Sequence, residues 1–398
     1  MEQSALFRTP QTIRYGRHSF RHVGEEAASR GKRALIISDK IMEQLGNVEQ
    51  CQQYLQDHGV ESSIYLGVNS EPTDQYVAEA LKLFKNDQCD IVISLGGGSC
   101  IDTAKAIAVL ATNGGYIGEY MGGRKIASRA PMPHISIPTT AGTGSEATDV
   151  TVITNTSNDV KMMIKQPSFM PTVAIIDPVL TQSSPRSITA ATGIDALSHA
   201  IEAYLSRRAH PMTDTIALSA MKLIVKNIKN AYIDGENMSA REAMSLGSLQ
   251  AGMAFTNSSV CLVHGMSRPI GALFHVPHGY SNAMLLPAVL EFSKEACVER
   301  LADLGRIFAS ENENLTNEEA ANHAVESVKE LCLSLNIPNL KGWGIDEKEF
   351  NLAVSKMVSD AIDSGSPANN PRVPNSQELE ELYHICYNYQ FDSKEKVQ

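Results

Sequence analysis

The chain has 398 residues, of which 43% are hydrophobic and 20% charged, and its formal net charge is −11. This length exceeds what one hydrophobic core usually serves, so we expect two domains of an ordinary globular protein. The acidic balance argues against a protein that binds phosphate backbones, so nucleic acid is not an expected partner. No basic start followed by an apolar core opens the chain, and no apolar run approaches the ~18 residues of a membrane span.

Seven cysteines are scattered along the chain, with no closely spaced pair. An odd number at such spacing argues against a disulfide framework and against a thiolate zinc site. It favours a protein of the reducing cytoplasm.

The first half of the chain alternates strand and helix signals. Short apolar runs predict strands, and apolar residues at helical spacing predict the helices between them. Strands separated by helices in this way imply βαβ units and a parallel sheet. The expected strands cover 33–38, 62–68, 90–95, 134–140, 151–155 and 172–178, and the expected helices cover 41–59, 73–88 and 99–112.

The second half changes character, because long helical patterns dominate after residue 178. We place the domain boundary near residue 185, at a Ser-Ser-Pro. We therefore expect an α/β domain over 1–185 and a helical domain over 186–398. A helical domain with histidines on its helices can grip a metal from several directions.

The stretch "SLGGGSCIDTAK" places Gly96, Gly97 and Gly98 between an expected strand and a helix that starts near Ser99. Glycines let the backbone approach a ligand closely, and the free N–H groups of the helix start face the same point. The pattern predicts a pyrophosphate site, with a plain strand-to-helix turn as the alternative. A second stretch, "PTTAGTGSEAT" over 138–148, suits ribose and phosphate contacts, or is a Ser/Thr-rich surface loop.

Asp39 follows the first expected strand. A carboxylate at that place can accept both hydroxyls of an adenosine ribose and would repel a 2′-phosphate, which favours NAD over NADP. A helix N-cap is the common alternative for such an aspartate, and the two roles are compatible.

Four residues of the second half form a candidate metal site. Asp195 and His199 are four residues apart, which puts them on one face of a helix. The mostly apolar stretch "HGMSRPIGALFHVPHG" adds His264 and His278. One carboxylate and three imidazoles suit a divalent transition metal. A lone histidine in an apolar setting is usually a hydrogen-bonded core residue, but four candidate ligands beside an independent phosphate site favour a metal.

These motifs resemble the iron-containing alcohol dehydrogenase family nearly from end to end. The resemblance is carried by "SLGGGSCIDTAKAIA", "PTTAGTGSEAT", "PTVAIIDPVLT", "GIDALSHAIEAY", "AGMAFTNS", "VHGMSRPIGALFHVPHG" and "NNPR". It implies a Rossmann-like α/β N-terminal domain with a parallel sheet, an all-α C-terminal domain, a dehydroquinate synthase-like fold overall, and an active site in the cleft between the domains. It also implies a homo-oligomer.

The resemblance assigns site residues as well. Its metal ligands fall on Asp195, His199, His264 and His278, with Fe(II) as the expected metal and zinc, nickel or manganese also accepted by this donor set. Its NAD contacts fall on Asp39, Gly96, Gly97, Gly98, Ser99, Asp102, Thr139, Thr140, Thr143, Lys161 and Leu180.

Arg268 departs from the family pattern, which commonly has a non-ligand histidine there that is assigned to proton relay. On a helix Arg268 lies one turn from His264. Arginine cannot shuttle protons at neutral pH, but its planar fork can hold a carboxylate, a sulfonate or a phosphonate. We therefore expect an anionic small aldehyde or alcohol as substrate, and a structural ion pair with an acidic residue of the same chain or of a partner subunit is the alternative.

Two further residues complete the expected substrate pocket. His275 is expected to line it or to take over proton relay, and a packed, hydrogen-bonded histidine is the alternative. Phe255 is expected to form an apolar wall of the pocket, or else to be ordinary core.

The expected reaction is a reversible hydride transfer between NAD and a small alcohol, with the metal polarising the substrate oxygen. A hydroxyacid–oxoacid transhydrogenase with a tightly held cofactor is the close alternative. A lyase of the dehydroquinate synthase type and a non-catalytic scaffold are more distant ones. The substrate, the physiological direction, the native metal and the subunit number do not follow from the sequence.

Overall fold

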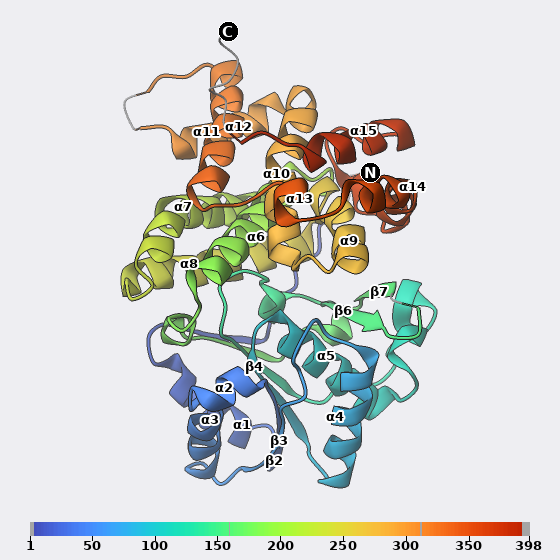
Figure 1. The fold of residues 1–398 in the computed structure, drawn as a ribbon. Coiled ribbons are helices and arrows are strands. Elements are labelled where there is room, and N and C mark those ends of the chain that lie inside the picture. The colour runs from blue at the N-terminus through green and yellow to red at the C-terminus, as the bar shows by residue number, and fades with distance from the viewer. Residues whose placement is uncertain (1–3, 159, 311–312, 392–398) are drawn as a thin grey trace. The chain divides into compact units, whose positions relative to one another are not determined.

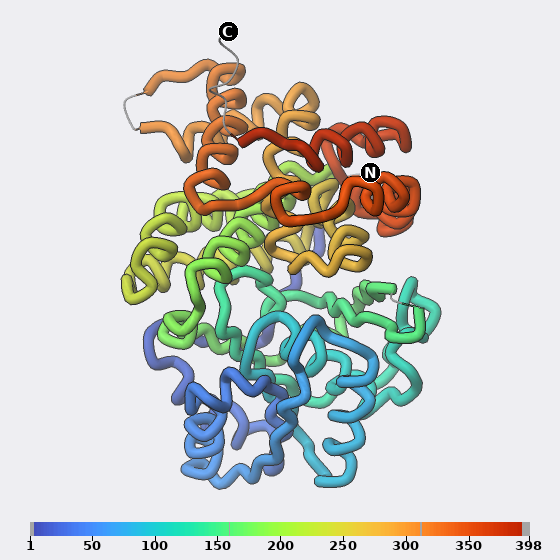
Figure 2. The backbone as a smooth tube through the Cα atoms, viewed as in Figure 1, coloured from blue at the N-terminus to red at the C-terminus, as the bar shows by residue number. Residues whose placement is uncertain are grey.

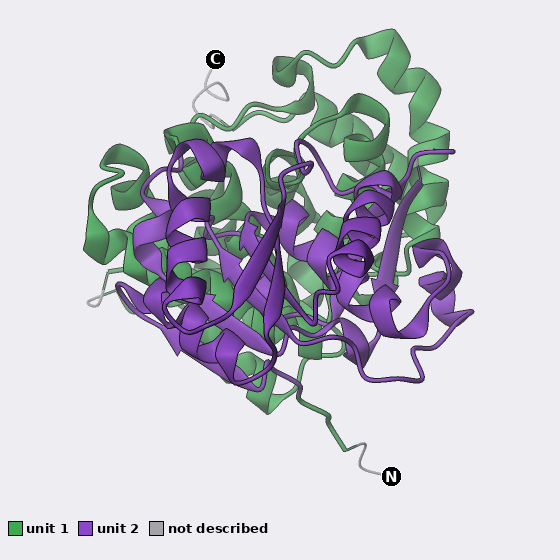
Figure 3. Cartoon of the chain, turned by 90° about the horizontal axis from the view of Figure 1, so that it is seen from below, with its two compact units in different colours: residues 1–7, 185–398 green, residues 8–184 purple. Residues whose placement is uncertain are grey.

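The structure is a computed structural model that describes residues 4–158, 160–310 and 313–391. Its backbone divides into two compact units, coloured separately in Figure 3. The first, which we call the α/β unit, covers residues 8–184 (purple). The second, the helical unit, covers the described residues from Pro185 onward together with residues 4–7 (green), which lie with the helices although the sequence grouped them with the sheet.

A six-stranded parallel sheet forms the centre of the α/β unit, in the order β1-β8-β5-β4-β2-β3. Every residue of β4, β5 and β8 is buried, as expected of parallel strands covered on both faces. A separate antiparallel pair, β6 and β7, lies outside this sheet. The strands are β1 Thr12–Tyr15, β2 Arg33–Ile37, β3 Glu61–Tyr65, β4 Ile91–Gly96, β5 His134–Pro138, β6 Val150–Asn155, β7 Val160–Lys165 and β8 Val173–Ile176.

Helices cover both faces of the sheet (Figure 1). Alternate strand residues point to opposite faces, so Leu35 and Ile37 pack with α4 and α5, whereas Ala34 and Ile36 pack with α1 and α3. The helix expected over 41–59 is wrong as a single element, because Gly46 adopts a left-handed φ of 77° and separates α2 from α3. The helices of this unit are α1 Val23–Ala28, α2 Lys40–Gln44, α3 Asn47–Gln56, α4 Asp74–Asn86 and α5 Gly98–Asn113, with 3-10 turns η1 Ser19–His22, η2 Ile117–Gly123, η3 Ser145–Ala147, η4 Pro167–Phe169 and η5 Pro178–Thr181.

The strand order reverses between β2 and β4. The chain runs from β2 outward to β3 and then returns to β4 on the other side of β2. In open parallel sheets, ligands bind beyond the carboxyl ends of the strands at such a reversal. Asp39 follows β2 and Gly97 follows β4, so the reversal carries both of these expected cofactor segments.

The described part of the helical unit holds helices and no strand, which with the parallel sheet confirms the expected fold class. Its central helix is α6, which contacts α7, α8, α9 and α10; Figure 2 shows the light green trace of α6 beside the yellow and orange traces of α9 and α10. From Thr189 to Leu205 nearly every residue of α6 is buried, including its polar ones. The helices are α6 Arg186–Leu205, α7 Pro211–Ile233, α8 Met238–Asn257, α9 Leu262–Phe274, α10 His278–Ser293, α11 Val298–Phe308, α12 Asn317–Ser334, α13 Leu340–Trp343, α14 Glu347–Asp363 and α15 Ser376–Tyr387, with 3-10 turns η6 Lys294–Ala296 and η7 Pro367–Asn369.

Two expectations from the sequence concern disulfide bonds and membrane-spanning segments. All seven cysteines lie among the described residues, and each is buried and free. Among the described helices, none combines the length and the apolar character that crossing a membrane requires.

Candidate metal centre and cofactor loops

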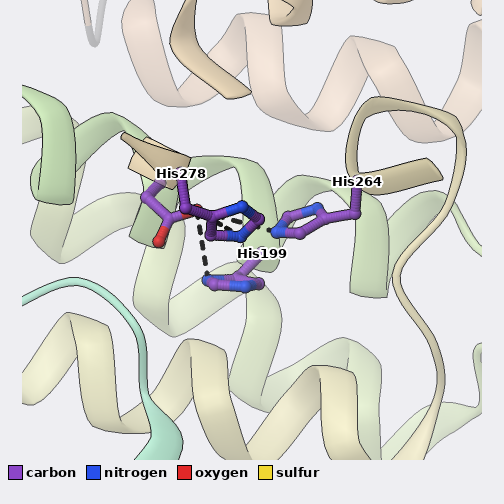
Figure 4. A group of neighbouring side chains, drawn as sticks. His199, His264 and His278 are labelled. Carbon is purple, nitrogen blue, oxygen red and sulfur yellow. Dashed lines mark ion pairs between the residues drawn. The ribbon is translucent and has the colours of Figure 1, made fainter. Parts of the chain in front are cut away.

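The four predicted metal ligands come together in the helical unit (Figure 4). Asp195 and His199 lie one turn apart on α6, His264 lies in the first turn of α9, and His278 is the first residue of α10. One ligand atom from each lies within 4.8 Å of all the others. Three of the four residues are buried, and the side chain of His278 is 37% exposed, so the cluster is open on one side.

The donor set fits a divalent cation. The nearest nitrogens of His264, His278 and His199 lie 3.6, 3.9 and 3.9 Å from Asp195 Oδ1. Burial alone would raise the pKa of Asp195, but the three imidazoles outweigh it and hold that pKa well below its usual range. The carboxylate therefore stays ionised among nitrogen donors, as a site for a transition metal requires.

Aromatic stacking fixes two of the imidazole rings. The ring of Phe255 stacks on His199 with centroids 4.3 Å apart and planes 16° apart, and His199 stacks on His264 at 4.4 Å. Phe255 thus packs directly against the ligand cluster. This contact holds the ring of His199 in one orientation, and the expected place of Phe255 in the wall of the substrate pocket remains a prediction.

Glu202 is a functional residue that the sequence analysis missed. It lies on α6 one turn beyond His199, and its buried carboxylate accepts hydrogen bonds from the backbone N–H groups of Cys261 (2.9 Å) and Val263 (2.6 Å). It also lies 2.6 Å from Nδ1 of His264. The carboxylate therefore caps the start of α9 and, by accepting the Nδ1 proton, leaves Nε2 of His264 free to bind a metal. A carboxylate three residues after a ligand on a buried helix was the available signal.

The pKa of His264 reflects the same contacts. Burial lowers it, but the carboxylates of Glu202 and Asp195 outweigh burial and raise the pKa to about 8. A cation that binds near neutral pH must therefore displace a proton from this ring.

Asn282 was also missed. It lies one turn after His278 on α10 and is fully buried. Its amide nitrogen lies 2.6 Å from Asp195 Oδ1 and 3.1 Å from Nε2 of both His264 and His278. Three of the four ligand residues thus converge on one amide group.

Arg268 lies on α9 one turn after His264, as the sequence predicted. Its guanidinium donates to the hydroxyl of Ser366 at 3.0 Å, and among the described residues no carboxylate lies within 4.0 Å of it. An ion pair within the described chain is therefore wrong, and an ion pair with a partner subunit stays an alternative. Burial lowers the pKa of Arg268 to about 10, so the side chain stays cationic at neutral pH.

His275 is not a packed residue. It ends α9 in a left-handed conformation (φ 54°), and it is exposed. The alternative of a packed, hydrogen-bonded histidine is therefore wrong, and its expected place in the substrate pocket remains a prediction.

The glycine turn of the α/β unit, which is the expected phosphate site, lies in close contact with the 138–148 loop. Gly97 caps α5, which begins at Gly98. A Cβ added to Gly98 would lie 2.9 Å from Cγ2 of Thr143, so the glycine turn and the 138–148 loop touch without room for a side chain. Asp39 caps α2 by accepting from the N–H of Met42 at 2.9 Å, which confirms the capping role.

Asp102 and the buried Lys105 hold the 138–148 loop in position through hydrogen bonds. The carboxylate of Asp102 accepts from the Ser145 hydroxyl at 2.6 Å and from the Val152 N–H at 2.8 Å. Lys105, which the sequence analysis did not single out, donates to Ser145, Thr148 and the carbonyl of Val150 at 2.6–2.8 Å. Burial lowers the pKa of Lys105 to about 8. These contacts set the position of the loop, whatever contact Asp102 makes with a cofactor.

The remaining predicted cofactor residues are spread along the same unit. Ser99 lies in the first turn of α5, and the N–H of Thr139 bonds the carbonyl of Gly96 at 3.1 Å. Lys161 on β7 pairs with Glu71 at 2.5 Å, and Leu180 in η5 packs into the core. Their contacts with NAD remain predictions.

Comparisons with known proteins agree with this geometry. The sequence profile described as iron-containing alcohol dehydrogenase matches residues 10–178, and that of the C-terminal part of the Fe-containing alcohol dehydrogenase family matches residues 189–387. The chain is 37% identical to a 1,3-propanediol dehydrogenase of Klebsiella pneumoniae, over 95% of this chain and 97% of that protein.

Solved structures are similar over nearly the whole chain. A 1,3-propanediol oxidoreductase matches with a TM-score of 0.92 and 36% identity, covering 96% of this chain and all of that one. A sulfoacetaldehyde reductase from Bifidobacterium kashiwanohense, solved with NAD+, matches with a TM-score of 0.87 and 28% identity, covering 98% and 100%.

A parallel sheet with a glycine turn at its reversal, joined in one chain to a helical unit with a cluster of one aspartate and three histidines, defines a metal- and dinucleotide-dependent class of enzyme. The chain belongs to the iron-containing alcohol dehydrogenase family and is an oxidoreductase acting on CH–OH groups. The family implies NAD(H) and a divalent metal.

Proposed function

We propose that this chain reduces a small aldehyde with NADH and oxidises the corresponding alcohol with NAD. Asp195, His199, His264 and His278 would hold a divalent cation, which when bound supplies Lewis-acid polarisation of the substrate oxygen. Fe(II) is the metal we propose, and the mixed oxygen and nitrogen donors also suit zinc, nickel and manganese. The protein itself holds the nicotinamide against the reacting carbon and excludes water.

The substrate that we propose carries a carboxylate, a sulfonate or a phosphonate. The observation behind this proposal is Arg268, a cation one helical turn from His264 with a serine hydroxyl as partner and no carboxylate among the described residues. A planar guanidinium in that state binds an oxyanion through two parallel hydrogen bonds. The similarity to a sulfoacetaldehyde reductase, by its name an enzyme of a sulfonated aldehyde, also supports an anionic substrate.

The test is a substrate panel with NADH after reconstitution with single metals. Sulfonated, carboxylated and phosphonated aldehydes are compared with a neutral aldehyde of similar size, for the wild type and for Arg268→His. Loss of charge-assisted hydrogen bonds should lower kcat/KM on the preferred anionic aldehyde roughly 10- to 100-fold, and on the neutral one by about threefold or less.

The matched control is Arg241→Met, which removes another buried guanidinium of the helical unit, bonded to Thr189 at 3.0 Å and to the carbonyl of Gly235 at 2.9 Å. It should leave the ratio between anionic and neutral substrates unchanged. Equal losses on both substrates in Arg268→His would reject the anionic substrate. Turnover between an alcohol and a second carbonyl compound without added NAD would instead indicate the transhydrogenase.

The compartment and the assembly are proposals as well. Seven buried, free thiols support the reducing cytoplasm as the place of action. A homo-oligomer is expected from the family resemblance, and light scattering of the purified protein tests it.

A further inference from the structure

We propose that Ser366 is a positioning residue for substrate selectivity: its hydroxyl fixes the guanidinium of Arg268 and leaves the positive charge available to an anionic substrate. The inference rests on the anionic substrate of the proposed function. The two residues are 98 positions apart in the sequence, and Ser366 lies just before the "NNPR" motif, to which the proposed function gives no role.

The first step is that the segment carrying Ser366 lies directly on α9. Ser366 precedes the 3-10 turn η7, which contacts α9. A Cβ added to Gly265 would lie 2.8 Å from Cδ and Cγ of the Pro367 ring, so the turn approaches the helix at a point where a side chain would collide. Gly265 and Arg268 are three residues apart on α9 and therefore share one helix face. The turn thus brings Ser366 to the face that carries Arg268.

The second step is that the hydroxyl of Ser366 is held in place. The residue is buried, with 3% of its surface exposed. Its carbonyl accepts from the N–H of Asn369 at 3.0 Å, which closes the turn, and the side-chain amide of Asn369 donates to the hydroxyl of Ser259 at 2.8 Å. The turn is therefore attached to α9 at Gly265 and to the segment before α9 at Ser259, so the hydroxyl keeps its position relative to this helix.

The third step is the chemistry of the contact. Nη1 of Arg268 donates to Oγ of Ser366 at 3.0 Å, and among the described residues Arg268 has no second hydrogen-bond partner. A hydroxyl oxygen is neutral, so it restricts the orientation of the guanidinium without cancelling its charge. A carboxylate in the same place would form an ion pair and occupy the fork that an oxyanion needs.

The consequence concerns substrate binding more than the chemical step. A long side chain that is already ordered loses less entropy when it binds a ligand. Ser366 should therefore lower KM for an anionic substrate and have little effect on kcat or on a neutral substrate.

The experiment compares kcat and KM for the preferred anionic aldehyde and for a neutral aldehyde of similar size, at saturating NADH. Ser366→Ala and the closely sized Ser366→Cys remove the oxygen acceptor. Both should raise KM for the anionic aldehyde roughly 3- to 10-fold, while kcat and the neutral KM change by less than about twofold. Ser366→Asp places a carboxylate against Arg268 and should lower kcat/KM on the anionic aldehyde roughly 10- to 100-fold, with a much smaller effect on the neutral one.

The control is Ser293→Ala. Ser293 is also buried, and its hydroxyl accepts from the amide of Asn370, in the same region of the chain, at 2.9 Å. It makes no hydrogen bond with Arg268 among the described residues. This variant should keep the wild-type ratio of kcat/KM between the two aldehydes.

An unchanged ratio in both Ser366→Ala and Ser366→Cys would overturn the positioning role, and so would an equal loss on both aldehydes, which marks a purely structural residue. An unchanged ratio in Ser366→Asp would overturn the claim that a neutral partner preserves the charge. In each case a lower ratio in Arg268→His would leave the proposed anionic substrate standing, whereas an unchanged ratio in that variant as well would reject it.

Discussion

Replacing Glu202 by glutamine changes one buried carboxylate and leaves the size of the side chain almost unchanged. Three donors converge on that carboxylate, from the backbone of Cys261 and Val263 and from Nδ1 of His264, at 2.6–2.9 Å. A glutamine has one acceptor oxygen in place of two. Its amide NH2 group is itself a donor, and it would face at least one of the three N–H groups. At least one buried donor is then left without a partner, which costs about 1–3 kcal/mol, and the bonds that persist lose their charge assistance.

We therefore expect Glu202→Gln to lower the free energy of unfolding by about 3 kcal/mol. Because the Nδ1 proton of His264 is no longer fixed, zinc affinity should fall roughly 10- to 100-fold, the usual effect of removing the hydrogen-bond partner of a metal-bound histidine. Chemical denaturation gives the first quantity, and chelator competition gives the second.

A matched control separates stability from orientation. Glu26 is a buried carboxylate of the α/β unit that accepts from Arg14 and Arg30 at 2.7 Å. Glu26→Gln should also lower stability, but it should leave zinc affinity unchanged. If Glu202→Gln bound zinc as tightly as the wild type, the reasoning that this carboxylate orients His264 would be refuted.

Three further predictions concern the cation, pH and the cofactor. Asp195→Asn should lose bound metal, measured by elemental analysis, and its activity should fall at least 100-fold; chelation should inactivate the wild type, and added metal should restore it. Burial raises the pKa of Glu146 from 4.5 to about 7, so the folded protein holds the extra proton and its free energy of unfolding should fall by up to about 3 kcal/mol as pH rises through that window. Urea titrations at several pH values should show this slope in the wild type and not in Glu146→Gln. Gly98→Val should raise KM for NADH more than tenfold, because the added side chain meets Thr143, with zinc affinity unchanged as the check on folding.

The four metal ligands could be predicted from the sequence because the patterns that mark them are local. The four-residue spacing of Asp195 and His199 fixes their common helix face wherever α6 lies, and an apolar setting marks His264 and His278 as unusual. Asn282 and Glu202 were missed because each acts only through partners that packing brings together. Glu202 could have been noticed by its spacing of three residues from His199, but its contacts with Cys261, Val263 and His264 arise only from the packing of α6 on α9. Asn282 carries no such signal, because asparagine is not a preferred ligand of transition metals.

Secondary structure could likewise be predicted where a strong local pattern of apolar residues is present. The predominance of long helices after residue 178 was predicted correctly, since many apolar positions specify one face of a helix such as α7. The edge strand β1 was missed because only four residues form it and none is fully buried, so it carries no apolar run. Gly46 was predicted to lie inside one helix over 41–59. A single glycine in a periodic stretch ends a helix only where the chain adopts a left-handed conformation, and the sequence does not show where that happens.

The arrangement on α6 has a consequence for how the site forms. Asp195, His199 and Glu202 lie on successive turns of one buried helix, so α6 alone supplies two ligands and the carboxylate that caps α9. The N-terminal turn of α9 is thereby held by the same residue that orients His264. A change that shifts α6 against α9 should therefore disturb the ligand cluster, the orientation of His264 and the cap of α9 together.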